Sequence, residues 1–169
     1  MAIKTGDKVP PVTLKAMGSD GLVDVSTDDF FGGKKVVLFA VPGAFTPTCS
    51  AKHVPGFTAN AAAIKAKGVD TIACLSVNDA FVMAAWGKDL AVDDDVTMLA
   101  DGNGDFTRAV GLGFDGSGYG LGERSQRYAM IVDDGTITTL AVEDGPGLDV
   151  SSAEAMLAKT RPLARAPSA

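Results

Sequence analysis

Short runs of β-branched and apolar residues alternate with segments of helical periodicity along most of the chain. The runs VVLFAV (36–41), DTIACLSV (70–77) and VTMLA (96–100) are largely apolar, which is typical of central strands covered on both faces. Apolar residues then recur at spacings of three and four over 49–66 and 79–90, and a shorter helix is expected within 104–112. This alternation predicts an α/β domain.

The C-terminal part has a different pattern. RYAMIVDDGTITTLAVE (127–143) is typical of two alternating strands joined by a tight turn at Asp134 and Gly135. The last helix is expected to begin at a capping box formed by Ser151 and Glu154 and to run through 153–160. We therefore predict a mixed central sheet with helices on both sides, in a single domain spanning 1–169.

Composition excludes several classes of function. The net charge is −6 and no basic residues cluster, which argues against a nucleic-acid partner. The longest apolar run, 36–41, is far shorter than the roughly 20 residues that span a bilayer. The N-terminus has no hydrophobic signal region, so we expect a cytoplasmic protein, or an organelle protein in its mature form. The two cysteines are expected to be free thiols.

Cys49 stands where a reactive thiol would be placed. It follows the apolar run 36–41 and a turn at Pro42 and Gly43, and it lies at the expected start of the next helix. The helix N-terminus favours a thiolate over a thiol. Pro42 and Pro47 offer no N–H donors, so the Thr46 hydroxyl and the remaining backbone N–H groups would face a small polar substrate. The alternative is a small buried apolar residue, but the combined pattern favours a reactive thiol.

The same stretch resembles a known family. PGAFTPTCS (42–50) has the P-x-x-x-T-x-x-C spacing of peroxiredoxins, and 41–57 together with CLSVNDAFVMAAW (74–86) resembles their type II, peroxiredoxin V-like branch. Three further blocks resemble the family in order: GDKVPPVTL (6–14), LADGNGDFTRAVGL (99–112) and GLGERSQRYAMIVDDG (120–135). The resemblance covers about residues 3–158.

This resemblance implies a thioredoxin-like fold with an added N-terminal segment, and thiol-dependent reduction of hydrogen peroxide and alkyl hydroperoxides without a cofactor. By position, Cys49 would be the peroxidatic cysteine, Thr46 the hydroxyl that holds the peroxide, and Pro42 the shield over the thiolate. Arg127 would be the neighbouring cation. Arg124 lies close in sequence, but Arg127 directly precedes YAMIV, where the family carries its arginine.

The resemblance also implies that Cys49 becomes a sulfenic acid and must be reduced again. Mammalian relatives use a resolving cysteine near the C-terminus, but this chain has GLDVSSAEAML (147–157) there. In plant-type relatives the cysteine matching Cys74 has been assigned as resolving. Here Cys74 is expected in a buried strand, where a disulfide with Cys49 would require local unfolding. We therefore favour a structural Cys74 and an external reductant, either glutaredoxin with glutathione or thioredoxin.

His53 is the only histidine and follows Cys49 by four positions. A Cys–His nucleophile pair is conceivable, but we expect a histidine packed or hydrogen-bonded near the site that tunes it. A structural zinc site needs four ligands, and Cys49, His53 and Cys74 supply three at most, so no metal is expected.

Three patterns imitate other sites. GLGFDG (111–116) matches GxGxxG, but no β-rich run precedes it and we expect a loop. DGNGDF (101–106) begins like a calcium loop, yet Phe106 replaces the required glycine, so a turn with a helix cap is expected. The acidic run 93–95 is expected to be a solvated loop.

The segment 79–90 bears on assembly. Phe81, Met83 and Trp86 are expected in the core. Relatives dimerise through the surface around this region and Phe45, so a homodimer is expected.

The sequence is also compatible with two other functions. A thiol–disulfide oxidoreductase is disfavoured because Thr46 stands where a CxxC partner would be. A catalytically silent binding module or holdase is the alternative from another class, but it has no physical need for the set Pro42, Thr46, Cys49 and Arg127.

Overall fold

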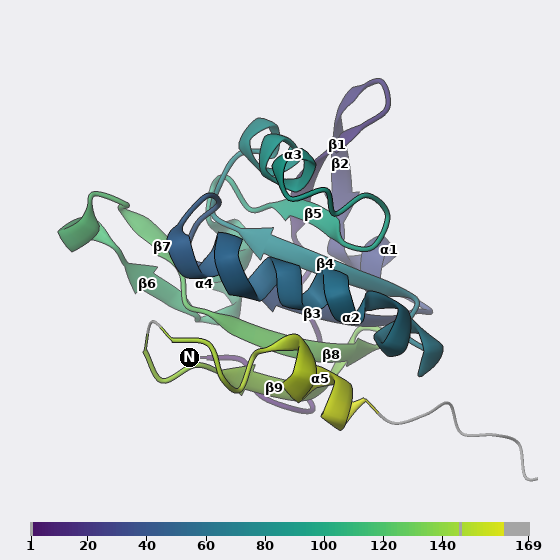
Figure 1. Cartoon of the computed structure of the whole chain (residues 1–169). Helices are drawn as coiled ribbons and strands as arrows, with labels where there is room; N and C mark the ends of the chain where they lie inside the picture. The colour runs from purple at the N-terminus through teal and green to yellow at the C-terminus, as the bar shows by residue number, and fades with distance from the viewer. Residues whose placement is uncertain (1, 146, 161–169) are drawn as a thin grey trace, which may run out of the picture.

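The computed structural model describes residues 2–145 and 147–160. Within them, seven strands form one mixed sheet, and its spatial order differs from the chain order (Figure 1). From edge to edge the strands are β2 (Gly21–Ser26), β1 (Thr13–Gly18), β5 (Thr97–Ala100), β4 (Thr71–Ser76), β3 (Lys35–Ala40), β8 (Tyr128–Asp133) and β9 (Thr136–Val142). Strands β3, β4 and β5 are parallel, and the other pairings are antiparallel. The predicted mixed sheet is confirmed.

Helices cover both faces of this sheet (Figure 1). One face packs against α2 (Val54–Ala66), α3 (Ala80–Asp89) and α5 (Ala153–Lys159), and the other packs against α1 (Thr27–Phe31) and α4 (Asp105–Val110). The remaining elements are η1 (Cys49–His53), η2 (Ser117–Tyr119), β6 (Gly113–Asp115) and β7 (Glu123–Ser125). None of the helices within the described ranges is long and apolar enough to cross a membrane.

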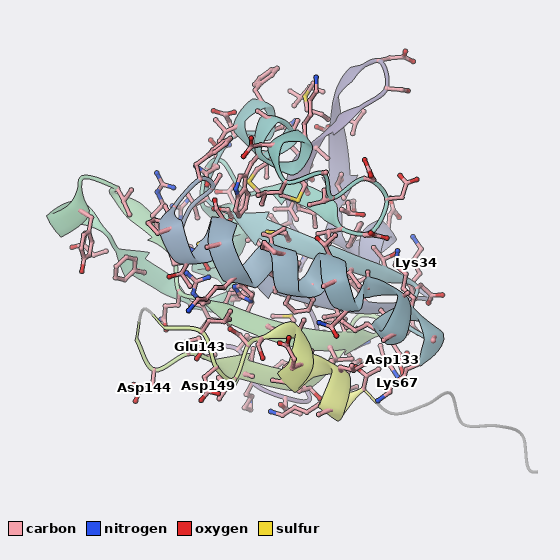
Figure 2. All side chains as sticks on the ribbon, in the orientation of Figure 1. Lys34, Lys67, Asp133, Glu143, Asp144 and Asp149 are labelled. Carbon is pink, nitrogen blue, oxygen red and sulfur yellow. The ribbon has the colours of Figure 1, made fainter. Side chains whose placement is uncertain are left out.

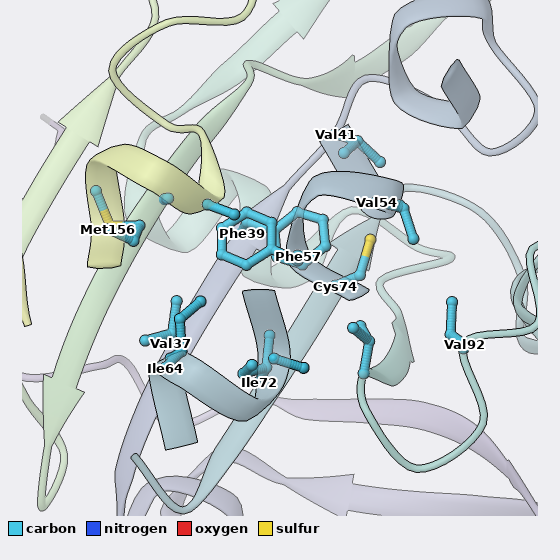
Figure 3. Packing of buried hydrophobic residues seen from close by; sticks show 14 of the residues in the cluster. Val37, Phe39, Val41, Val54, Phe57, Ile64, Ile72, Cys74, Val92 and Met156 are labelled. Carbon is cyan, nitrogen blue, oxygen red and sulfur yellow. The ribbon is translucent and has the colours of Figure 1, made fainter. Parts of the chain in front are cut away.

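Burial explains why residues 36–40 of strand β3 are all apolar. It pairs with β4 on one side and β8 on the other, so neither edge is exposed. Val37 and Phe39 face the cluster under α2, whereas Val36 and Leu38 face the cluster under α1 and α4. The Phe39 ring stacks on Phe57 of α2 (Figure 3), and the ring centroids are 4.0 Å apart. Successive side chains of residues 36–40 are buried on opposite faces, and the one charged residue of the strand, Lys35, stands at its start.

The helix expected over 49–66 has the expected extent, but its first turn is wider than an α-helix. Residues 49–53 form the π-helical turn η1, in which the Val54 N–H bonds to the Cys49 carbonyl. Pro55 follows, and because it has no N–H it cannot make the regular bond to the carbonyl of Ala51. The wider turn changes where the side chains of Cys49 and His53 point.

Turn and cap chemistry agrees with the sequence at three places. Asp134 and Gly135 have φ of 47° and 79°, which are the positive values of a type I′ hairpin turn. The Asp79 carboxylate caps α3 by accepting the Val82 N–H at 2.8 Å. Asp101 accepts the N–H groups at the start of α4, as a turn with a cap should.

The acidic run 93–95 is exposed in turns, as expected.

The capping box expected at Ser151 is wrong. The N-cap of α5 is Ser152, whose hydroxyl accepts the Ala155 N–H at 3.1 Å. The Ser151 hydroxyl instead donates to the Glu143 carboxylate at 2.6 Å, because β9 brings Glu143 beside it. Ser151 therefore bonds to Glu143, which is distant in the sequence, and does not cap α5.

Three further expectations need correction. Phe81 is 64% exposed, because it faces away from the sheet, whereas Met83 and Trp86 are in the core as expected. The motif GLGFDG is not entirely a loop, because its residues 113–115 form strand β6, which pairs with β7. The β1–β2 hairpin was not expected from the sequence. Its strands are largely exposed, so they lack the apolar pattern that reveals a central strand.

Candidate active site

Cys49 lies just past the carboxyl end of β3, at the first residue of η1. Its side chain is fully buried. The intervening loop is held in place by backbone and side-chain bonds: the Val41 N–H donates to the Leu75 carbonyl, and the Ala44 N–H donates to Asn78 Oδ1, each at 3.0 Å. The tip of β4 and the residues after it therefore fix the position of the cysteine.

The positively charged side chain of Arg127 contacts the Cys49 thiol. It immediately precedes β8, which lies beside β3 in the sheet, and its Nη2 donates to Cys49 Sγ at 3.2 Å. Arg127 is only 5% exposed, so water screens this contact poorly. A guanidinium group cannot lose its charge at ordinary pH, so the sulfur has a permanent positive neighbour.

His53 accepts a hydrogen bond from the other terminal nitrogen of the Arg127 guanidinium group. Arg127 Nη1 donates to His53 Nδ1 at 2.8 Å, and His53 Nε2 lies 2.9 Å from the Ser151 carbonyl. Arginine can only donate and a carbonyl can only accept, so the ring is the neutral tautomer with its proton on Nε2. Burial, aided by the charge of Arg127, lowers the pKa of His53 to about 4.

This geometry argues against a Cys–His nucleophile pair. Both ring nitrogens of His53 are used, one by Arg127 and one by Ser151, so neither is available to take a proton from Cys49. The imidazole acts on the site only through the arginine. Among the described residues, no group of three or more His, Cys, Asp or Glu side chains could hold a metal ion.

Thr46 and Arg124 both bond to the loop that precedes Cys49. Thr46 Oγ1 donates to the Gly43 carbonyl at 2.6 Å, which leaves its oxygen as an acceptor. Arg124 Nε donates to the Leu121 carbonyl at 2.9 Å, and its Nη1 donates to the Pro42 carbonyl at 3.4 Å. Arg124 therefore joins two loops, whereas Arg127 is the arginine that reaches the sulfur.

Gly43 lies close to the side chains of Arg124 and Thr46. A Cβ added there would come within 2.9 Å of Arg124 Nη1 and 3.0 Å of Thr46 Cγ2. A side chain at position 43 would therefore require the end of the Arg124 side chain to shift.

A pocket of about 720 Å³ opens beside this site. Its lining combines the loop before η1, the β6–β7 hairpin and the end of β9: Pro42, Thr46, Pro47, Thr48, Gly113, Phe114, Asp115, Tyr119, Leu121, Gln126, Arg127, Glu143 and Gly145. Arg127 is thus shared between the pocket and the thiol. The Arg127 Nε–H is buried and has no hydrogen-bond partner among the described residues.

Cys74 is fully buried in the middle of β4, where it pairs in register with Phe39 of β3. Burial, together with the nearby Cys49, raises the pKa of Cys74 well above its ordinary value. The thiol therefore stays protonated and is a poor nucleophile at neutral pH.

Phe45 and Trp86 lie close to each other, and Trp86 contacts the residue that follows Cys49. Phe45 has a φ of 62° and is 52% exposed, with its ring centroid 6.3 Å from that of Trp86. Trp86 Nε1 donates to Ser50 Oγ at 2.9 Å, which links α3 to the residue after Cys49.

Sequence reasoning missed Ser50, Glu143 and Ser151 as neighbours of the site. The Ser50 bond was missed because its partner, Trp86, lies on a different helix. Ser151 lies 98 positions from His53, and it acts through a backbone carbonyl that no residue pattern can reveal.

Comparison with known proteins adds an independent finding. Residues 4–157 match the family described as Redoxin. The chain belongs to the Redoxin family. It is 51% identical to chloroplastic peroxiredoxin-2E of Arabidopsis thaliana, with 92% of this chain and 68% of the relative covered. It is 49% identical to peroxiredoxin-2B of the same plant, with 92% and 96% covered.

Solved structures agree with this assignment. The crystal structure of reduced Prx3 in complex with H₂O₂ from Vibrio vulnificus has a TM-score of 0.91 and 52% identity, covering 94% of this chain and 99% of that one. Peroxiredoxin 5 from Alvinella pompejana has a TM-score of 0.83 and 38% identity, covering 94% and 97%. The chain has the thioredoxin-like peroxiredoxin fold and is a type II peroxiredoxin, a thiol peroxidase. This finding argues against a catalytically silent module.

Proposed function

We propose that this thiol peroxidase reduces hydrogen peroxide and alkyl hydroperoxides through Cys49. The observation that carries the proposal is the 3.2 Å bond from Arg127 Nη2 to Cys49 Sγ, beside a pocket that Thr46 also lines. The Cys49 thiolate attacks one peroxide oxygen and the O–O bond breaks. The other oxygen leaves with its electron pair and takes up a proton, giving water or an alcohol, and Cys49 becomes a sulfenic acid.

Arg127 and Thr46 would orient the peroxide for this attack. Because the Thr46 hydroxyl already donates to Gly43, its oxygen accepts the O–H of the hydroperoxide. The Arg127 Nε–H donates to the departing oxygen as negative charge builds there. A donor aimed at developing charge stabilises the transition state more than the ground state. Pro42, in the pocket wall, shields the thiolate from water.

The pocket supports alkyl hydroperoxides as substrates. Its volume of about 720 Å³ exceeds what hydrogen peroxide needs, and Phe114 and Leu121 give it an apolar wall. The organic group of a hydroperoxide would pack against this wall while its O–O bond lies at Arg127. The related Vibrio vulnificus protein has been solved in complex with hydrogen peroxide, which supports hydrogen peroxide as a substrate of this chain.

Recycling is proposed to use an external thiol, either glutaredoxin with glutathione or thioredoxin. The buried, protonated Cys74 supports this proposal, because it cannot attack a sulfenic acid on Cys49 without local opening of η1. The cytoplasmic location and the single domain spanning 1–169 stay predictions from the sequence.

One experiment tests the site and the recycling scheme together. Intact-protein mass is measured after one equivalent of hydrogen peroxide with a sulfenic-acid trap present, for the wild type, Cys49→Ser and Cys74→Ser. We expect a trapped adduct on Cys49 in the wild type and in Cys74→Ser, and none in Cys49→Ser. A mass loss of two hydrogens, localised to a Cys49–Cys74 disulfide, would contradict external recycling. Peroxide consumption by Cys49→Ser would contradict the site assignment.

We also propose a homodimer. Phe45 and Phe81 are both large apolar side chains left more than half exposed, and both belong to segments next to Trp86. Burying these two rings against a second copy would remove apolar surface from water close to the active site.

A further inference from the structure

The Glu143 carboxylate accepts several hydrogen bonds from the segment that leads into α5. Its Oε2 accepts from the Asp149 N–H at 2.8 Å, the Ser151 N–H at 2.8 Å and the Ser151 hydroxyl at 2.6 Å. Figure 2 shows Glu143 and Asp149 together on the segment between β9 and α5. These bonds hold Ser151 fully buried. One carboxylate therefore determines where the Ser151 backbone lies.

Ser151 in turn determines where His53 lies. The Ser151 carbonyl accepts the His53 Nε2–H at 2.9 Å, and this bond selects the tautomer that leaves Nδ1 as an acceptor. Arg127 Nη1 donates to that nitrogen at 2.8 Å while Nη2 of the same planar group donates to Cys49 Sγ. Because a guanidinium group is rigid, fixing Nη1 also fixes the direction of Nη2.

Glu143 and Arg127 are also adjacent through the backbone. The Glu143 N–H donates to the Arg127 carbonyl at 2.9 Å, directly beyond the Tyr128–Val142 pair of β8 and β9. The path Glu143–Ser151–His53–Arg127 thus begins and ends on neighbouring positions of one hairpin. Both end residues line the pocket.

We propose that Glu143 is a positioning residue for peroxide reduction, acting through Ser151 and His53 on the guanidinium group of Arg127. This proposal rests on the peroxidase function of Cys49 proposed above. The hydrogen bonds of the carboxylate go to Asp149 and Ser151, so Glu143 is linked to the thiol through Ser151, His53 and Arg127. Its effect is to keep Arg127 aimed at the reacting sulfur, which is a requirement of geometry that sequence spacing does not reveal.

The test measures the second-order rate constant for Cys49 oxidation by hydrogen peroxide. Trp86 is the single tryptophan and bonds to Ser50, so its fluorescence in a stopped-flow instrument reports on the site. We compare Glu143→Ala, His53→Ala and the double variant with the wild type. Asp144→Asn is the matched control, because it removes an exposed carboxylate from the adjacent position (Figure 2).

We expect Glu143→Ala and His53→Ala each to lower the rate constant about tenfold, and the double variant to be little slower than either single variant. Asp144→Asn should react like the wild type. Glu143→Gln, which keeps an acceptor oxygen, should recover part of the rate, and it replaces Glu143→Ala in the cycle if the alanine variant does not fold.

Two outcomes would overturn the proposal. A wild-type rate in Glu143→Ala would show that Arg127 needs no such support, and losses that multiply in the double variant would show that Glu143 does not act through His53. If the wild type itself does not react, the proposed function fails rather than this inference.

Discussion

Arg127 holds two different acceptors with the two ends of one planar group, Cys49 Sγ at 3.2 Å and His53 Nδ1 at 2.8 Å. A lysine could not do this in the same way, because its three donors share one nitrogen and do not form a rigid planar fork. Sequence reasoning could name Cys49 from its motif and choose Arg127 over Arg124 from its place before β8. It could not see that the arginine is shared with His53, since the two residues lie 74 positions apart.

At the residue scale, His53 makes the folding stability depend on pH. Its pKa is about 4 in the folded protein, against an ordinary value of 6.5, chiefly because it is buried. The unfolded chain therefore binds the proton more readily between these values, and stability falls as pH drops from about 6.5 toward 4, by roughly 3 kcal/mol in total.

Urea unfolding of the wild type and His53→Gln at pH 7 and pH 4.5 checks this prediction. Carboxylates that titrate in the same range are present in both proteins, so their contributions to the change in stability cancel in the comparison. The wild type should lose more stability than the variant between the two pH values. Equal losses of stability in the two proteins would mean that folding does not lower the pKa of His53.

At the scale of elements, the buried strands β3, β4 and β5 and the hairpin β8–β9 followed from the sequence. Central strands carry long apolar runs because both faces are covered, and Asp134–Gly135 has the chemistry that a type I′ turn requires. The β1–β2 hairpin did not follow, because its strands are largely exposed and their residues can be polar or apolar. The cap of α5 was misplaced because Ser151 bonds to Glu143.

Two glycine substitutions test this element-level account in opposite directions. Gly135→Ala should destabilise the protein by about 1 kcal/mol, because φ of 79° is unfavourable for a residue with a Cβ. Gly56→Ala should stabilise it by about 0.5 kcal/mol, since Gly56 lies in α2 and a Cβ there would meet only Ala153 Cβ, at 3.8 Å. Thermal unfolding of both variants measures the difference, and a shift of the same sign in both would contradict it.

At the scale of the whole molecule, the sheet places the active site and the exposed aromatic rings at the same end. Phe81 was expected in the core, but it is 64% exposed on α3, which is why it is available for contact with a second copy. Its exposure supports the proposed dimer more directly than the sequence did. Apolar area left in water near a functional site commonly marks an interface.

Replacement of Phe81 by aspartate should convert the proposed dimer to a monomer. A charge at the centre of an apolar contact cannot be buried without a partner, so association should weaken by a factor of about 100 or more. Sedimentation equilibrium would then give 17.2 kDa for the variant and twice that mass for the wild type. Asp89→Asn, at the end of the same helix, serves as a control that should remain dimeric. A monomeric wild type would contradict the proposal.

The sequence by itself determined the α/β class, the central strands, the type I′ turn and the family, because each depends on residue types at short, regular spacings. The tertiary structure alone decided which acceptors surround Arg127, which tautomer His53 adopts and where Ser151 bonds. These depend on strands β8 and β9 bringing 127 and 143 beside residues 49 and 53, and on a backbone carbonyl that has no signature in the sequence. Local patterns record local geometry, whereas the electrostatics of a buried site is set by neighbours distant in the chain.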